Sequence, residues 1–166
     1  MRAFAILVLA LLTGLASAES IKIGYLNIEE VVNNLTQYRL GNERITDNFD
    51  SRKKELLSLF KHIELLKESL NSKSNQIITE SYENEIKHIN RLEVNFQKDT
   101  ELWQYQLNQE KQLLMQQVEL LINQAVERLA KEWLYDLILY DNVAFTSDKI
   151  ADISYDVINL IEASSP

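Results

Sequence analysis

Two long stretches of the chain carry apolar residues at helical spacing. Between Ile77 and Trp133 there is no Gly and no Pro, so nothing in the backbone chemistry would stop a helix. Apolar and aromatic side chains recur there mostly three or four residues apart, which predicts one stripe on a long helix. At 1.5 Å per residue this helix would be roughly 85 Å long. We therefore expect it to project from the fold and to need a partner along its length.

A second helical pattern, from Asn42 to Leu70, supplies that partner. Its apolar residues have similar spacing, and the polar cluster at 71–76 separates the two runs. This order predicts an antiparallel helical hairpin with its tip near 71–76. Because the cluster contains neither Gly nor Pro, a single uninterrupted helix is the alternative. The second arm is longer than the first, so its base should extend into the body of the protein.

The N-terminal part of the body begins with an alternating pattern. Ser20 to Leu26 predicts a half-buried strand. Asn27 is then placed to cap a short helix, with Glu29 and Glu30 in its first turn near the positive end of the helix dipole. The apolar pattern loosens from Thr36 to Gly41, where we expect a kink or a short break.

The C-terminal part changes from helical to strand periodicity after Leu134. Leu137 to Leu139 predicts one short strand and Val143 to Phe145 a second. Asp152 is expected to cap a terminal helix. Its inward-facing residues would be Ile153, Val157, Ile158 and Ile161.

The predicted fold is α+β and mostly helical, with the hairpin arm at 42–121 and a small body built from 19–41 and 122–166. Three short strands and a small helix form too little core to support such long arms. Oligomerisation would solve this by closing several small sheets into a β-barrel and removing their exposed edges.

The composition of the chain indicates where the protein is located and which net charge it carries. Residues 1–18 combine Arg2, an apolar run and the small-residue segment Ala16-Ser17-Ala18, which predicts a secretory signal peptide rather than an uncleaved anchor. After its removal no segment is apolar enough for stable membrane insertion. The remaining chain has 16 basic residues (17 minus Arg2) and 25 acidic ones, a net charge of −9, which argues against nucleic acid as a partner.

Sequence motifs that would indicate catalysis or metal binding are weak. There is no Cys, and the sequence has no Gly-rich phosphate loop and no Ser in an elbow motif. Glu85 and His88 have the spacing of a di-iron ligand pair, but the only other histidine, His62, follows Leu59 by three residues rather than a carboxylate. We therefore expect no enzyme activity, no metal and no cofactor.

The order of parts resembles the Skp (OmpH) family of periplasmic chaperones. Four segments carry the resemblance: Ile21 to Asn27 (IKIGYLN), the long hairpin, Tyr135 to Phe145 (YDLILYDNVAF) and Asp152 to Ile161 (DISYDVINLI). It covers nearly the whole chain after the signal peptide. The hairpin alone is unspecific, and the C-terminal segments are the more diagnostic part.

The resemblance implies a homotrimer with a β-barrel body and three helical arms around a cavity. Such proteins act in the periplasm as ATP-independent holdases for unfolded outer-membrane proteins. By matching position, the barrel and trimer contact would be built by Ile21, Ile23, Leu137, Leu139, Val143 and Phe145. The candidate residues for contact with the unfolded protein are Phe60, Leu66, Leu70, Ile77, Tyr82, Phe96 and Trp103.

The net charge departs from the family pattern, because the well-known members are strongly basic. We therefore do not carry over a lipopolysaccharide site, and we expect contacts with unfolded proteins that depend little on salt. The competing hypothesis is a structural or adaptor coiled-coil protein of the cell envelope that binds one folded partner. Suppression of aggregation of unrelated unfolded proteins would separate the two hypotheses.

Overall fold

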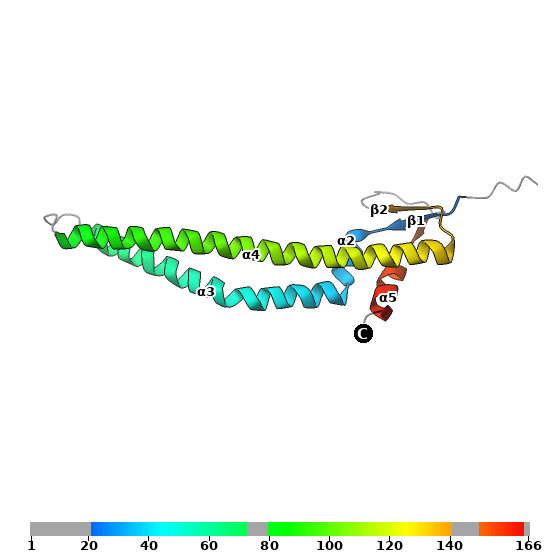
Figure 1. Ribbon diagram of the computed structural model, residues 1–166, viewed down its shortest axis with the longest axis horizontal. Coiled ribbons are helices and arrows are strands. Elements are labelled where there is room, and N and C mark those ends of the chain that lie inside the picture. Colours follow the sequence, from blue (N-terminus) through cyan, green and yellow to red (C-terminus); the bar gives the residue numbers. More distant parts are fainter. Residues whose placement is uncertain (1–20, 73–79, 141–149, 165–166) are drawn as a thin grey trace, which may run out of the picture.

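The computed structural model describes residues 21–72, 80–140 and 150–164. Within them the chain is mostly helical with one small sheet, so the expected α+β class is confirmed (Figure 1). Two long helices form an extended hairpin, and the short elements gather in a body at one end of it. In chain order the elements are β1 (Ile23–Leu26), α2 (Ile28–Asn34), α3 (Thr36–Ser72), α4 (Glu80–Trp133), β2 (Leu137–Tyr140), β3 (Ala151–Asp152) and α5 (Ser154–Ser164).

The hairpin prediction is confirmed, because α3 and α4 lie side by side and run in opposite directions (Figure 1). This arrangement excludes the alternative of one uninterrupted helix. With 54 residues against 37 in α3, α4 is roughly 80 Å long. Its base therefore extends past the start of α3 into the body. At the predicted tip, Asn71 and Ser72 end α3, and positions 73–79 lie outside the described residues.

The break before the first arm lies earlier than predicted. The chain leaves the helical conformation only at Leu35 (φ −77°, ψ 126°), and α3 starts at Thr36 rather than near 42. Leu35 is 1% exposed, so its burial in the core fixes the turn. Gly41 does not interrupt α3. Instead, it gives room to α4, since a Cβ atom at Gly41 would lie 2.4 Å from Leu114 Cδ1.

The sheet joins the two ends of the chain. Its strand order is β2-β1-β3, and both neighbours of β1 are parallel to it. The predicted strand at Leu137 is confirmed, with Ile23 paired to Leu137 and Tyr25 to Leu139. The predicted strand Val143–Phe145 lies outside the described residues. Within the described parts of the chain the sheet is open, with β2 and β3 at its edges.

The strand β3 was not predicted from the sequence. The sequence pattern makes Asp152 a helix cap, and the structure gives it two roles. It pairs with Tyr25 in the sheet, and its Oδ1 atom accepts a hydrogen bond from the Ser154 N–H at 2.9 Å. The Ser154 hydroxyl in turn accepts from the Asn27 N–H at 2.8 Å. This contact connects the start of α5 to the start of α2.

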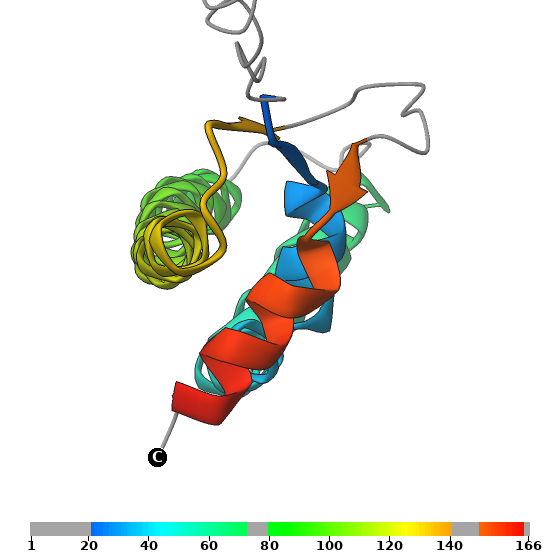
Figure 2. The ribbon, with the colours of Figure 1, turned by 90° about the vertical axis from the view of Figure 1, so that its right-hand side faces the viewer.

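The core lies where the base of α4 meets β1, α2 and α5. Figure 2 looks along the hairpin from the body end and shows α4 on one side, with α5 packed along α2 on the other. The predicted inward face of α5 is confirmed. The buried core that this face joins consists of Leu26, Val31, Val32, Leu35, Val118, Ile122, Ala125, Val126, Leu129, Ile153, Val157, Ile158 and Ile161.

The N-terminal strand is also tied to the end of α4. The Lys22 ammonium donates to the Trp133 carbonyl at 2.6 Å and lies 4.3 Å from the centre of the Tyr135 ring. The Lys22 N–H donates to the Asp136 carboxylate at 2.7 Å. Leu134, which follows Trp133, has a left-handed backbone conformation (φ 54°) and ends α4 as a C-terminal cap.

Candidate functional site

The arm residues predicted to contact unfolded protein lie mainly along the seam between α3 and α4. Phe60 is 47% exposed, whereas the other described members are half-buried. Those half-buried residues are Leu66, Leu70, Tyr82, Phe96 and Trp103. Ile77 lies outside the described residues. The predicted set therefore combines hairpin packing with partial access from solvent.

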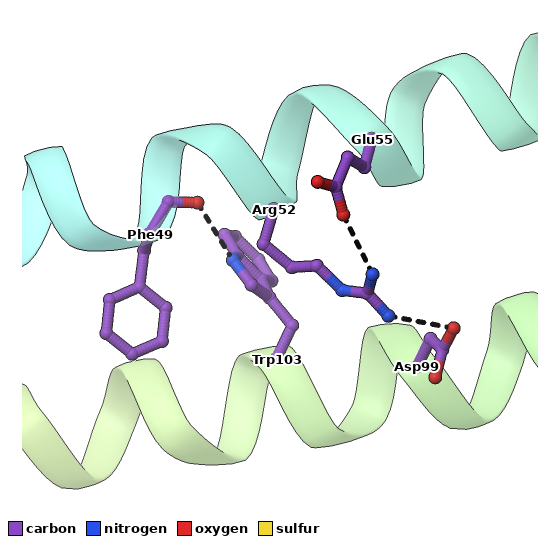
Figure 3. Close-up of polar contacts among 5 residues, drawn as sticks. All are labelled: Phe49, Arg52, Glu55, Asp99 and Trp103. Atoms are coloured by element: carbon purple, nitrogen blue, oxygen red, sulfur yellow. Dashed lines mark hydrogen bonds and ion pairs between the residues drawn. The ribbon is translucent and has the colours of Figure 1, made fainter.

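Aromatic residues hold the middle of the seam. The Trp103 indole N–H donates to the Phe49 carbonyl at 3.2 Å (Figure 3). This hydrogen bond fixes the Trp103 ring against the backbone of α3. Nearer the tip, the Phe60 and Phe96 ring centres lie 5.8 Å apart and tilted, a separation typical of favourable aromatic pairs. These contacts set the spacing of the two arms.

Two cationic side chains of α3 reach across the seam to carboxylates of α4. Arg52 lies 2.8 Å from Glu55 on its own helix and 2.9 Å from Asp99 on α4 (Figure 3). The hydrogen bond to Glu55 and the charge of Asp99 raise the pKa of Arg52. All three groups are solvent-accessible, so such pairs contribute little to stability and mainly fix orientation.

Lys67 repeats this arrangement near the tip. It lies 2.6 Å from Glu93 of α4 and 3.3 Å from Glu64 of α3. Its hydrogen bonds to Glu93 and then Glu64 raise the pKa of Lys67. The two bridges keep α3 and α4 in register on either side of the Phe60–Phe96 contact.

A second apolar stripe runs along α4 on the side turned away from α3. At about 100° per residue its members fall within roughly a 100° sector that points away from the seam. Each is at least 50% exposed. The members of this outer stripe are Val94, Leu102, Tyr105, Leu113 and Leu120. Sequence reasoning assigned one stripe to this helix and missed the outer one, although its spacing of three, seven and eight residues was a usable signal.

The predicted barrel residues lie at the other end of the molecule. Ile21 is 72% exposed and Leu137 47% exposed, while Ile23 and Leu139 are half-buried. Val143 and Phe145 lie outside the described residues. Tyr140, at the end of β2, is also 47% exposed. The edge of the sheet thus presents apolar side chains to solvent in a single chain.

In the described parts of the chain no group of three or more His, Cys, Asp or Glu side chains is placed to hold a metal ion. Glu85 and His88 lie at the exposed end of α4 together with Ser81 and Asn84. Among the described helices, none has the length and apolar character that crossing a membrane requires.

Comparison with known proteins agrees with this architecture. The family model for outer membrane proteins of the OmpH-like type matches residues 22–161. A solved structure of a proposed outer membrane chaperone (OmpH-like) from Caulobacter crescentus superposes with a TM-score of 0.72. The match has 13% sequence identity and covers 92% of this chain and 90% of the other. A search of curated proteins found no match. The extent of the family match shows that this chain belongs to the OmpH-like outer membrane protein family.

Proposed function

We propose that this protein is an ATP-independent holdase chaperone of the periplasm that binds unfolded outer-membrane proteins between its helical arms. The observation that carries the proposal is the outer stripe of α4, five large apolar or aromatic side chains left uncovered along one face of a projecting helix. Apolar side chains that recur along one exposed face of a projecting helix provide separate contact points for another chain along its length. Family membership and the likeness to a proposed chaperone support the same function.

The chemistry of this surface suits a holdase. Binding through separate apolar side chains requires no defined partner structure, so chains of different sequence can be held by the same arm. Each leucine that loses about half of its exposed surface to a bound chain contributes roughly 1 kcal/mol. Contacts of this size are individually reversible, and release needs no nucleotide.

The assembly we propose is a homotrimer whose sheets close into one barrel. Within the residues that the structure describes, β2 and β3 form the two edges of the sheet, and apolar residues of β2 are exposed there. Pairing of these edges between copies would satisfy the backbone groups and cover Leu137 and Tyr140. Three arms fixed to one body would then enclose a space for the unfolded protein.

Location in the periplasm rests on the predicted signal peptide at 1–18 and on family membership. A holdase needs its unfolded partner in the same compartment. Outer-membrane β-barrel proteins cross the periplasm before insertion, which supports them as the bound class.

The first experiment is native mass spectrometry of the chain from Glu19, alone and after dilution of a urea-unfolded β-barrel membrane protein. We expect a trimer that captures one unfolded chain, and captures unrelated ones equally well. A monomer or dimer that ignores unfolded chains would contradict the proposal and favour an adaptor that binds one folded partner.

A matched pair of variants then tests the outer stripe. Leu102→Ser with Leu113→Ser removes two stripe residues, and Leu57→Ser with Leu65→Ser removes two leucines of α3 that are at least as exposed. We expect the first pair to weaken capture roughly 10- to 30-fold, from about 1 kcal/mol per leucine. Equal losses in both pairs would show that contact is spread over all apolar surface and not directed by the outer stripe.

A further inference from the structure

A cavity of about 270 Å³ lies between the arms, nearer the body than the Phe60–Phe96 contact. Its apolar wall is formed by Ile45 and Phe49 of α3 and by Trp103 and Leu107 of α4. The hydrogen bond from the Trp103 indole to the Phe49 carbonyl holds the ring in place. The Trp103 side chain that lines the cavity is therefore held in place by the hairpin seam.

Two basic side chains line the same cavity from opposite arms. They belong to Lys53 of α3 and Lys111 of α4. The carboxylate that also lines it, Asp50, lies 2.6 Å from Lys54, and that hydrogen bond lowers the pKa of Asp50. Within the described residues no carboxylate lies within ion-pair distance of Lys53 or Lys111, although the charge of Lys53 acts weakly on Asp50.

The cavity thus combines an aromatic and aliphatic wall with two lysines that form no ion pair within the described residues, in a chain whose net charge is −8. An aromatic side chain entering it would stack near the Trp103 ring and leave water. A carboxylate beside that side chain would lie near Lys53 and Lys111. The two requirements specify an aromatic residue next to an acidic one.

We propose that this cavity is a subsite of the holdase that takes an internal segment of an unfolded chain in which an aromatic residue is adjacent to Asp or Glu. The proposal rests on the holdase function and adds a local sequence preference to it. We assign an internal segment, because the arms meet a bound chain along its length whereas each chain has only one carboxyl terminus. The subsite would anchor one point of the bound chain while the outer stripe holds the rest less selectively.

The test uses the full chain with Trp133→Phe, which leaves Trp103 as its only tryptophan. The probes are blocked hexapeptides, acetyl-Gly-Ser-Phe-Glu-Ser-Gly-amide and the same peptide with Gln for Glu or Ala for Phe. Binding is followed by Trp103 fluorescence. We expect the Phe-Glu peptide to bind most tightly, with a several-fold loss when either the aromatic ring or the charge is removed.

The lysine variants locate the charge contact. Lys53→Gln and Lys111→Gln should each reduce the preference for Glu over Gln by about two- to fivefold, as expected for partly exposed ion pairs. Lys87→Gln, an exposed lysine of α4 outside the cavity, is the control and should leave the preference unchanged. Because all three are surface substitutions, their folding is expected to match that of the parent chain.

The outcomes separate the subsite from the holdase function. Equal binding of the Phe-Glu and Phe-Gln peptides, or an unchanged preference in both cavity lysine variants, would overturn the subsite. Tighter binding of a peptide that ends in Phe with a free carboxylate would overturn the assignment to an internal segment. If the same preparation still suppresses aggregation of an unfolded β-barrel protein, only the subsite fails. If suppression is also absent, the holdase proposal itself fails.

Discussion

Replacing Ser154 by alanine should weaken the joint between the two ends of the chain. Ser154 is 2% exposed, and its hydroxyl oxygen accepts the Asn27 N–H at 2.8 Å across 127 residues of sequence. Ser154→Ala removes that acceptor and leaves the amide of a half-buried residue without a partner. Leaving a buried donor unsatisfied costs about 1–3 kcal/mol, and partial access of Asn27 to solvent places the expected loss at about 1–2 kcal/mol.

Urea unfolding at one fixed protomer concentration measures this loss. With an m-value of about 2 kcal/mol/M, the midpoint should fall by roughly 0.5–1 M. The concentration must be fixed, because association would otherwise change the apparent stability. Hydrogen exchange gives a local check, since the Asn27 amide should exchange about tenfold faster once its acceptor is removed.

Ser164→Ala is the matched control in the same helix. The Ser164 hydroxyl donates to the Leu160 carbonyl in the exposed last turn of α5, so its removal should change stability by less than about 0.5 kcal/mol. The reasoning is refuted if Ser154→Ala keeps the parent midpoint and the Asn27 amide stays protected. That result would mean that the amide has another acceptor.

Three further substitutions test the arms and their base. Thr100→Val should stabilise the chain by about 1 kcal/mol, because the buried Thr100 hydroxyl has no hydrogen-bond partner among the described residues. Thr46→Val should not, because it removes an existing hydrogen bond. Leu134→Gly should raise the free energy of unfolding by about 1 kcal/mol, since Gly adopts φ 54° without the steric cost paid by Leu, and an unchanged midpoint would contradict this. Gly41→Val should cost about 1–3 kcal/mol through overpacking against Leu114, and Leu114→Ala in the same chain should reduce that cost in a double-mutant cycle.

The sequence predicted those features that depend on the local spacing of apolar residues along the chain. The hairpin, the base of α4 and the buried face of α5 follow from apolar spacing, and the Asn27 cap follows from one side chain that accepts the Glu30 N–H at 3.0 Å. The break at Leu35 could not be placed from local pattern, because it depends on where that side chain meets the core. Gly41 suggested the wrong position for the break between helices, since its small size serves the contact with α4 and not a turn.

The features that sequence analysis missed are those that depend on contacts between segments far apart in the chain. Strand β3 has two residues, and its extended form depends on pairing with Gly24 and Tyr25. Likewise, the outer stripe of α4 was hidden by the stronger seam pattern on the same helix. Which of two apolar faces packs against α3 is decided by the partner helix, and no periodicity of α4 alone contains that information.

The position of β1 between two later strands sets the order in which the molecule can be completed. Synthesis delivers β1 first, but Leu137 and Ala151, which pair with it, follow more than a hundred residues later. Helices form from local contacts within microseconds, whereas pairing at such sequence separation is slow. The arms therefore exist, with their outer stripe uncovered, before the body closes. During that interval the core residues of the body, such as Leu26 and Val157, are still exposed, as apolar residues are in the unfolded proteins that this chain is proposed to hold.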